Sequence, residues 1–387
     1  MLATITTPSI MLIGGGAISE LAQVLAKLDC AKPLIVTDPF MRDSGKLSAI
    51  TDVLASASIN WQVFADTVPE PTDDVVVTGA DIIRAGDFDS LIALGGGSPI
   101  DTAKAMSLLA HGGGTVRDYK VPNQPNQRGL PVIAIPTTAG TGSEVTKVTV
   151  ITDKSNDEKM LIMGLGCLPA AAIVDYELTY SVPQRTTADT GLDSLTHAIE
   201  AYVSVRHNPF TDTLALSAMR LIAKNIRVAC NEPGNSGARE AMMLAATQGG
   251  MAFSNASVCL VHGMSRPIGA FFHVAHGLSN AMLLPTVTAF SAPAAMDRYA
   301  DCARAMDLAN QDTAADAAVA SLITELRQLN TDLQVPSPRS YGIEKDKYFS
   351  LLSIMAEQAL ASGSPNNNPR VPSAEDITQL YREAWNA

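Results

Sequence analysis

The hydrophobic and polar positions of this chain follow different periods in its two halves. In the first half, short apolar runs alternate with amphipathic stretches that have the spacing of helices. Strands that alternate with helices predict βαβ units and a parallel sheet. The strands that we predict are Met11–Ile13, Pro33–Thr37, Trp61–Phe64, Ser90–Leu94 and Val132–Ile135.

From about residue 183 onward the helical period continues with little strand signal. Pro267 is expected to end the helix that carries His262. We therefore predict an α/β domain over residues 1–183, followed by an all-helical domain over residues 184–387. The helices that we predict in the second half are Thr190–Val203, Thr211–Cys230, Ala238–Val261, Met296–Ala309 and Thr313–Leu329.

Composition and charge narrow the class of protein. The 387 residues are 47% hydrophobic and 17% charged, as in ordinary globular proteins, and the net charge of -12 argues against a nucleic-acid partner. No Lys or Arg precedes Lys27, and no apolar run approaches the ~20 residues of a membrane helix. The five scattered cysteines fit buried thiols in a reducing compartment. We predict a cytoplasmic protein that contacts neither nucleic acid nor membrane.

Two glycine clusters follow predicted strands. Gly14–Gly16 follows the first strand, and Gly95–Gly97 with Ser98 lies between the strand Ser90–Leu94 and a predicted helix. Glycines at such a turn let the backbone approach a pyrophosphate, and the helix N-terminus offers unpaired N–H groups. Neither cluster has the G-x-G-x-x-G spacing, so a tight turn without a ligand is the alternative for both.

Two further segments point to a nucleotide. Residues 136–144 (PTTAGTGSE) follow the strand Val132–Ile135 and are rich in hydroxyl groups, which suit phosphate or ribose. Asp38 follows the second strand, where a carboxylate can bind the ribose hydroxyls and repel a 2′-phosphate. These loops predict a dinucleotide, and Asp38 predicts NAD rather than NADP. The alternative for Asp38 is that it only caps the following turn.

Candidate metal ligands occur in the predicted helical half. Asp193 and His197 are four residues apart in a predicted helix, so they project from one face and can meet a single cation. His262, His273 and His276 follow within 15 residues of each other. His273 and His276 are three apart, so one can bind a metal while the other lines the pocket. Hydrogen-bonded core histidines are the alternative, but the combined pattern favours a metal site.

Four motifs occur in this order along the chain: GGGSPIDTAK, PTTAGTGSE, TGLDSLTHAIEAYVS, and the H-x13-H span that ends in HGLSNAMLLP. In order and spacing they resemble the iron-dependent (group III) alcohol dehydrogenases, which include lactaldehyde reductases and 1,3-propanediol dehydrogenases. The resemblance covers essentially the whole chain. It implies an α/β nucleotide domain, an all-helical domain and an active site in the cleft between them. We also expect a homo-oligomer, a dimer or larger.

The resemblance implies roles for individual residues. The metal ligands would be Asp193, His197, His262 and His276. Lys159 is assigned to the nucleotide as a residue of a loop that follows a strand. The full set of expected cofactor contacts is Asp38, Gly96, Gly97, Ser98, Asp101, Thr137, Thr138, Thr141 and Lys159.

One position departs from the family. Many members have the sequence H-A-M-A-H-P where this chain has His262 to Pro267, so that Arg266 replaces a second histidine. The replacement leaves the four ligands in place but changes the expected proton path and substrate class. We expect His273 to relay protons, and Arg266 to take part in catalysis or to meet an anionic group of the substrate.

The resemblance implies a small alcohol or aldehyde as substrate, NAD as hydride carrier and Fe(II) as the metal. A divalent cation lowers the pKa of an alcohol, and nicotinamide accepts hydride. Zinc in a closed four-ligand site would leave no position for substrate, whereas Fe(II) accepts five or six ligands. Zinc can still occupy the site, because its affinity for such ligands is high.

Three other functions fit parts of the pattern. A zinc polyol dehydrogenase of the glycerol type would share the fold with a different ligand set. A maleylacetate reductase would keep the nucleotide loops without the full set of metal ligands. A non-catalytic subunit that binds metal or nucleotide is the third, although no motif here is degraded.

Overall fold

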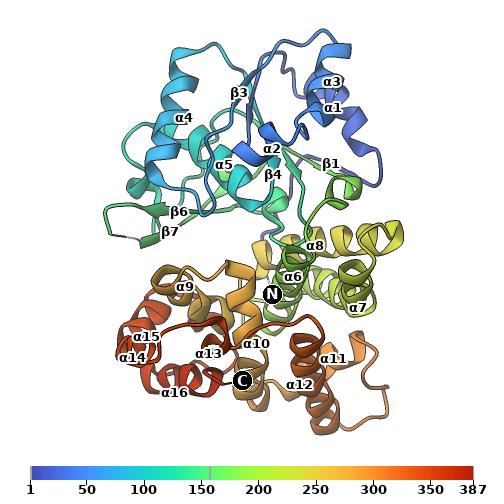
Figure 1. Cartoon of the computed structure of the whole chain (residues 1–387), viewed down its shortest axis with the longest axis vertical. Helices are drawn as coiled ribbons and strands as arrows, with labels where there is room; N and C mark the ends of the chain where they lie inside the picture. The colour runs from blue at the N-terminus through green and yellow to red at the C-terminus, as the bar shows by residue number, and fades with distance from the viewer. Residues whose placement is uncertain (1, 157, 387) are drawn as a thin grey trace. The chain divides into compact units, whose positions relative to one another are not determined.

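The structure is a computed structural model that describes residues 2–156 and 158–386. The chain divides into two compact units, shown in Figure 1: Ile5–Val182, and Pro183–Ala387 together with Met1–Thr4. The first unit contains a sheet with helices, and the second is helical.

A six-stranded parallel sheet forms the centre of the first unit, in the order β1-β8-β5-β4-β2-β3. This confirms the predicted α/β fold class. All five predicted strands are present within one or two residues of their expected limits, and β8 is an additional strand that we did not predict. The strands are β1 (Ile10–Ile13), β2 (Pro33–Val36), β3 (Gln62–Phe64), β4 (Ser90–Gly95), β5 (Val132–Pro136) and β8 (Ala171–Val174).

Apolar side chains on both faces of the sheet explain its three layers. In β4, Leu91 and Ala93 pack in one core cluster, whereas Ile92 and Leu94 pack in the other. Because side chains alternate along a strand, a continuous apolar run is buried on both faces. The first cluster includes α4 (Asp73–Ala85) and α5 (Gly97–Gly112), and the second includes α1 (Leu21–Lys27) and α3 (Ser48–Ser56).

A two-stranded antiparallel hairpin of β6 (Val148–Asp153) and β7 (Glu158–Met163) was not predicted from the sequence. It corrects the expected position of Lys159, which lies in strand β7 and not in a loop. The β6 side chains alternate between buried and partly buried, but the buried positions include the polar residues Thr149 and Asp153, which concealed this period in the sequence.

Helix α6 (Gln184–Val203) is buried along most of its length, and α7 (Pro209–Asn231), α8 (Ser236–Ala256) and α10 (His276–Ser291) pack against it. A helix covered on several sides belongs in the centre of a bundle. This arrangement confirms the predicted all-helical second half. The remaining helices are α9 (Leu260–Phe272), α11 (Met296–Ala305), α12 (Ala315–Asp332), α13 (Pro338–Tyr341), α14 (Lys345–Ser350), α15 (Leu352–Ala361) and α16 (Ala374–Ala384).

Several helix limits differ from the prediction: α6 begins at Gln184 rather than Thr190, and α11 ends at Ala305 rather than Ala309. Two further differences have identifiable reasons. The helix expected over Ala238–Val261 is broken after Ala256, because Ser257 has a positive φ of 88° and the side-chain amide of Asn367 bonds the Ser257 Oγ and the Val258 carbonyl. Pro267 does not end a helix but lies inside α9. The fully buried Met264 and Ile268 on either side show that packing offsets the lost backbone hydrogen bond.

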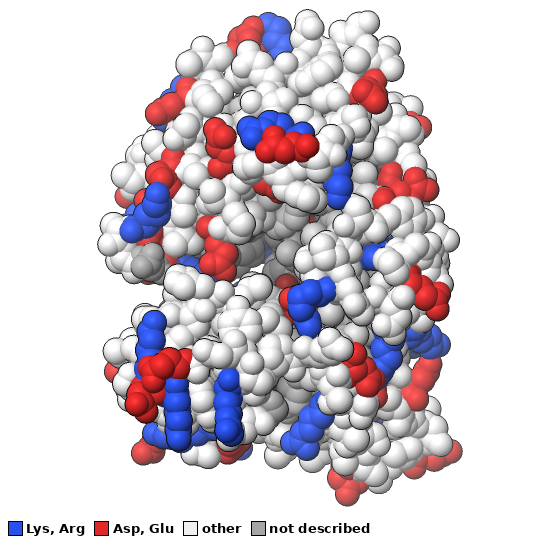
Figure 2. All heavy atoms as spheres, viewed as in Figure 1, with Lys and Arg blue, Asp and Glu red and all other residues white. Residues whose placement is uncertain are grey.

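The helices of both units and one face of the surface bear on possible membrane and polyanion partners. No helix among the described residues is both long and apolar enough to span a bilayer. On the face shown in Figure 2, acidic and basic side chains occur in small mixed groups. The large single-sign patch that a polyanion requires is not visible on that face.

Candidate metal centre and nucleotide loops

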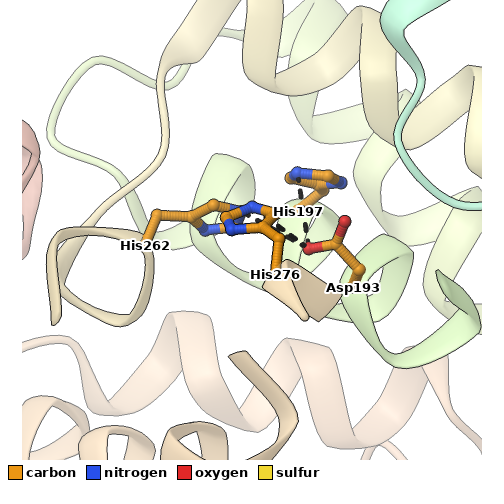
Figure 3. Close-up of side chains that lie close together, drawn as sticks. All are labelled: Asp193, His197, His262 and His276. Atoms are coloured by element: carbon orange, nitrogen blue, oxygen red, sulfur yellow. Dashed lines mark ion pairs between the residues drawn. The ribbon is translucent and has the colours of Figure 1, made fainter. Parts of the chain in front are cut away.

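Four side chains of the helical unit converge on one point, as Figure 3 shows. Asp193 and His197 lie one turn apart on α6, His262 lies in the first turn of α9, and His276 is the first residue of α10. Asp193 Oδ1 is 3.8 Å from His197 Nε2, 3.6 Å from His262 Nε2 and 3.8 Å from His276 Nε2. Atoms that each lie ~2.0–2.2 Å from one cation are roughly 3–4 Å apart. The spacing therefore suits a single metal ion.

Three of the four side chains of the cluster are buried, and the fourth is exposed to solvent. The side chains of Asp193, His197 and His262 are only 3–5% exposed, whereas that of His276 is 41% exposed. A catalytic metal site needs such an open side, because substrate must reach a coordination position. One carboxylate and three imidazoles form a donor set that suits divalent iron, which accepts five or six ligands. The residues present therefore fit this metal.

Glu200 orients His262 from behind the cluster. Its carboxylate accepts hydrogen bonds from His262 Nδ1 at 2.7 Å and from the backbone N–H groups of Cys259 at 2.8 Å and Val261 at 2.6 Å. The bond to Nδ1 directs Nε2 of the same ring toward Asp193. Sequence reasoning missed Glu200, although it lies three residues after His197 and seven after Asp193, on the same face of α6.

Asn280 also reaches the cluster and was also missed. Its Nδ2 donates to Asp193 Oδ1 at 2.7 Å and lies 3.2 Å from His262 Nε2 and 3.3 Å from His276 Nε2. Its Oδ1 is buried with no hydrogen-bond partner among the described residues. The amide nitrogen of Asn280 thus contacts three of the possible ligands, while the buried oxygen of the same side chain is left unsatisfied, which is uncommon in folded proteins. The spacing from His276 to Asn280, one helical turn, was the available signal.

Charge interactions stabilise the ligands in the form that attracts a cation. Burial alone would raise the pKa of Asp193, but His197, His276 and His262 together lower it well below its usual range. Burial would lower the pKa of His262, but the bonds with Asp193 and Glu200 outweigh burial and raise it to about 9. Asp193 is thus an anion at neutral pH, and protons compete with a metal for His262.

Close helix packing brings His276 to Asp193. A Cβ on Gly277 would lie 2.4 Å from the Asp189 carbonyl oxygen and 3.2 Å from Asp193 Cβ, so only glycine permits this approach of α10 to α6. Phe253 stacks on the His197 ring with centroids 4.3 Å apart, and His262 lies 4.6 Å from the same ring. Backbone and ring packing thus limit the movement of the ligands.

The two residues predicted to act in catalysis lie outside the metal cluster. His273 is exposed and directly follows the last residue of α9. Its own backbone has the left-handed conformation, with φ 54°. Arg266 lies on α9 one turn after His262 and is partly buried. Burial lowers the pKa of Arg266 to about 10, against the attraction of Glu200.

The predicted nucleotide loops of the first unit lie at one edge of the sheet, because they all follow parallel strands. Thr37 Oγ1 donates to the Leu94 carbonyl at 2.8 Å, and the Thr137 N–H donates to the Gly95 carbonyl at 2.9 Å. These bonds link the ends of β2, β4 and β5. Such an edge of a parallel sheet is where nucleotides bind in α/β folds.

The glycine loop and the threonine loop are in contact. A Cβ on Gly96 would lie 3.4 Å from Thr138 Oγ1, and one on Gly97 would lie 3.0 Å from Thr141 Cγ2. Gly97 is also the first residue of α5, with Ser98 next to it. The N-terminus of a 16-residue helix therefore faces this loop pair with its backbone N–H groups.

Three of the predicted nucleotide contacts already have partners in the protein. The Asp101 carboxylate accepts from Ser143 Oγ at 2.6 Å and from the Val150 N–H at 2.8 Å. Lys159 Nζ pairs with Glu70 at 2.7 Å. Asp38 Oδ1 caps α2 (Pro39–Asp43) by accepting the Met41 N–H at 2.9 Å.

Comparison with known proteins matches both units. Residues 8–176 match the family model described as iron-containing alcohol dehydrogenase, and residues 187–385 match the C-terminal model of the Fe-containing alcohol dehydrogenase family. The chain belongs to the iron-containing alcohol dehydrogenase family. The resemblance inferred from the motifs is thereby confirmed, as is the reaction class of a metal-dependent oxidoreductase acting on alcohols and aldehydes.

Similar proteins cover the chain almost end to end. The lactaldehyde reductase of Escherichia coli (strain K12) is 35% identical over 375 residues, which are 96% of this chain and 97% of that protein. The structure of a 1,3-propanediol oxidoreductase has a TM-score of 0.95 and 33% identity, covering 99% of this chain and 100% of the other. The sulfoacetaldehyde reductase from Bifidobacterium kashiwanohense, solved in complex with NAD+, has a TM-score of 0.89 and 29% identity, covering 100% and 99%.

Proposed function

We propose that this enzyme interconverts a small primary alcohol or diol and its aldehyde, with NAD as hydride carrier. Asp193, His197, His262 and His276 hold one divalent iron ion. The observation that carries the proposal is the position of three imidazole nitrogens 3.6–3.8 Å from Asp193 Oδ1. When bound, the metal supplies Lewis acidity that lowers the pKa of an alcohol, and nicotinamide accepts the hydride.

The residues around the cluster have separate tasks in this proposal. Glu200 holds His262 in one tautomer, and Asn280 fixes the orientation of the Asp193 carboxylate. Phe253 covers the His197 ring and excludes water from that side. The exposed side at His276 is the side from which substrate enters.

The nucleotide is proposed to bind at the edge of the sheet. Gly96, Gly97 and Ser98 offer backbone N–H groups at the start of α5 to the pyrophosphate. The further contacts come from the threonine loop, at Thr137, Thr138 and Thr141. The short distances between the two loops support this assignment: a Cβ on Gly97 would be tight against Thr141 at 3.0 Å, and one on Gly96 would contact Thr138 at 3.4 Å.

Three charged residues complete the proposed nucleotide site. Asp38 uses one oxygen to cap α2, which leaves the other for the ribose hydroxyls. Lys159 would exchange its pairing with Glu70 for a phosphate or ribose oxygen. Asp101 acts through Ser143, because its carboxylate accepts from the Ser143 hydroxyl and thereby supports the threonine loop from below.

His273 is proposed to relay a proton between the reacting oxygen and solvent. Its exposure at the end of α9 supports exchange with water. A histidine is suited to this task because its ordinary pKa lies near neutral pH.

We also infer a cytoplasmic location and a homo-oligomer of two or more subunits. All five cysteines are buried free thiols, which supports a reducing compartment. Strand β1 is at the edge of the sheet and Ile13 is 47% exposed, so a second copy can cover it. Light scattering at several concentrations tests the oligomer, and a monomer throughout would contradict it.

Reconstitution with metals tests the proposed reaction. Protein stripped with a chelator is reloaded without oxygen with Fe(II) or Zn(II), and NADH and NADPH oxidation are followed with aldehydes of two to four carbons. We expect Fe(II) to restore more activity than Zn(II), and NADH to be the preferred reductant. Higher activity with zinc, or no activity with any metal, would contradict the proposal.

A further inference from the structure

Arg266 is a cationic side chain on α9, the helix that also carries His262 of the metal cluster. It lies four residues after His262 on α9, so the two side chains leave the same face of the helix with Cβ atoms ~5–6 Å apart. The part of the chain that the structure describes provides no hydrogen bond or ion pair to its guanidinium group. Its nitrogens are not among the buried side-chain atoms that lack a partner, so the guanidinium group remains accessible to water or to a bound group.

The surroundings of Arg266 do not explain its charge. Glu200 is the acidic group that acts on it, yet the Glu200 carboxylate already accepts from His262 Nδ1 and from two backbone N–H groups. Burial also disfavours the charged form, so that the pKa of Arg266 is lowered to about 10. A guanidinium group has five N–H donors in a fixed plane, which match the two oxygens of a carboxylate or sulfonate.

We propose that Arg266 binds an oxyanion of the substrate, so that the enzyme prefers short aldehydes and alcohols that carry a carboxylate or sulfonate. The proposal deepens the function proposed above and rests on it, since it places the reacting oxygen at the metal cluster. Because the two side chains leave α9 one helical turn apart, we expect a short substrate with an anionic end to reach both the cluster and Arg266. Arg266 is thus a specificity-determining residue.

The alternative is that only the aliphatic part of Arg266 matters. An arginine can pack its methylene groups on apolar neighbours while its charged end contacts water. In that case, substitutions at Arg266 would change the rates for charged and neutral substrates by the same factor. The two explanations therefore differ in a ratio of rates, and this ratio is insensitive to general damage to the site.

Matched substrates measure this ratio. The probes are 4-oxobutanoate and its neutral isostere 4-oxobutanamide, with NADH and the Fe(II)-loaded enzyme. A charge-assisted bond favours the anion by about 10- to 100-fold in kcat/KM. Arg266→Met should lower the anion-to-amide ratio of kcat/KM toward one, and Arg266→Lys should retain an intermediate ratio. Sulfoacetaldehyde, compared with propanal, extends the test from carboxylate to sulfonate.

Controls separate specificity from folding. Arg206→Met replaces an exposed arginine of the same unit and should leave the ratio unchanged. Melting temperature and metal content identify any variant that fails to fold or to bind metal, and Arg266→Lys then serves as the informative variant. An equal ratio in wild type and Arg266→Met, or no preference for the anion in wild type, would overturn the proposal.

A binding measurement keeps this proposal distinct from the proposed reaction. Titration calorimetry with butanoate and butanamide, in the presence of NADH, requires no turnover. Wild type should bind butanoate at least about tenfold more tightly than butanamide, and Arg266→Met should lose this difference. If the enzyme reduced neither aldehyde, the reaction would be wrong, and calorimetry would still decide the role of Arg266. Equal binding of butanoate by wild type and Arg266→Met would overturn it.

Discussion

In the helical unit, the proposed binding atoms belong to one carboxylate and three imidazoles, and Glu200 and Asn280 hydrogen-bond to two of these groups. In the sheet unit, the proposed binding groups are backbone N–H groups and hydroxyls at glycine and threonine loops. A side chain that binds metal can be deleted by one substitution, whereas a backbone donor cannot. Single substitutions should therefore have larger effects at the metal cluster than at the nucleotide loops.

The largest effect is expected for loss of a metal ligand. Asp193→Ala and His262→Ala should each lower kcat by more than ~10²-fold, because even loss of residues that only orient a ligand costs 10- to 100-fold. Metal content should fall in parallel, while NADH affinity, measured by fluorescence, should stay near that of wild type. His111→Ala removes an exposed histidine of the sheet unit and is the matched control. Normal turnover in His262→Ala would show that the cluster has another role.

A smaller loss is expected at His273. The variant His273→Gln should lower kcat by about 10²-fold, the lower limit for lost acid–base help, because the exposed ring can be replaced in part by water. Its pH–rate profile should also become flatter near neutral pH, while metal content stays unchanged. A profile identical to that of wild type would assign proton transfer to Arg266 or to water.

The next effect concerns the second layer of the metal cluster. Glu200→Gln keeps the shape of the side chain but weakens its bond to His262 Nδ1, so Fe(II) affinity should fall by about 10- to 100-fold. An equilibrium titration against a competing chelator measures this change. Glu240→Gln, at an exposed position of α8, should leave the affinity unchanged. Equal affinities in the two variants would limit Glu200 to a role in folding.

The smallest effect is expected at the nucleotide loops. Asp38→Asn keeps a side-chain oxygen that can cap α2, but it removes the charge that repels a 2′-phosphate. The preference for NAD over NADP in kcat/KM should fall by about tenfold, equivalent to ~1.4 kcal/mol, with little change in melting temperature. If the NAD/NADP ratio stays constant and Asp38→Ala lowers only the melting temperature, Asp38 has a capping role alone.

The two units also differ in how much of their structure and of their candidate sites could be predicted from the sequence. The parallel sheet followed from apolar runs, since the inner strands β2, β4 and β5 are buried on both faces and are therefore continuously apolar in the sequence. The pair Asp193 and His197 followed from helical spacing alone. The choice of His276 over His273 came from family resemblance, because the conformation at the end of α9 that separates the two residues has no periodic signal.

Other features depend on contacts between distant residues. The break after α8 relies on Asn367, more than one hundred residues away, and α9 continues through Pro267 because neighbouring residues are buried. Glu200 and Asn280 have helical spacing to the proposed ligands. Their contacts with the cluster can be recognised only when the packing of α6, α9 and α10 is known. Local patterns contain no information on such long-range contacts.

X-ray absorption at the iron edge tests the central claim most directly. The sample is wild-type protein loaded with one equivalent of Fe(II) without oxygen, with Asp193→Ala and His111→Ala as comparisons. We expect nitrogen and oxygen ligands at ~2.0–2.2 Å and outer-shell scattering from three imidazoles in wild type and His111→Ala. Asp193→Ala should bind less iron. Sulfur ligands, no imidazole scattering, or the same spectrum and iron content in Asp193→Ala would contradict the assignment of this cluster as the iron site.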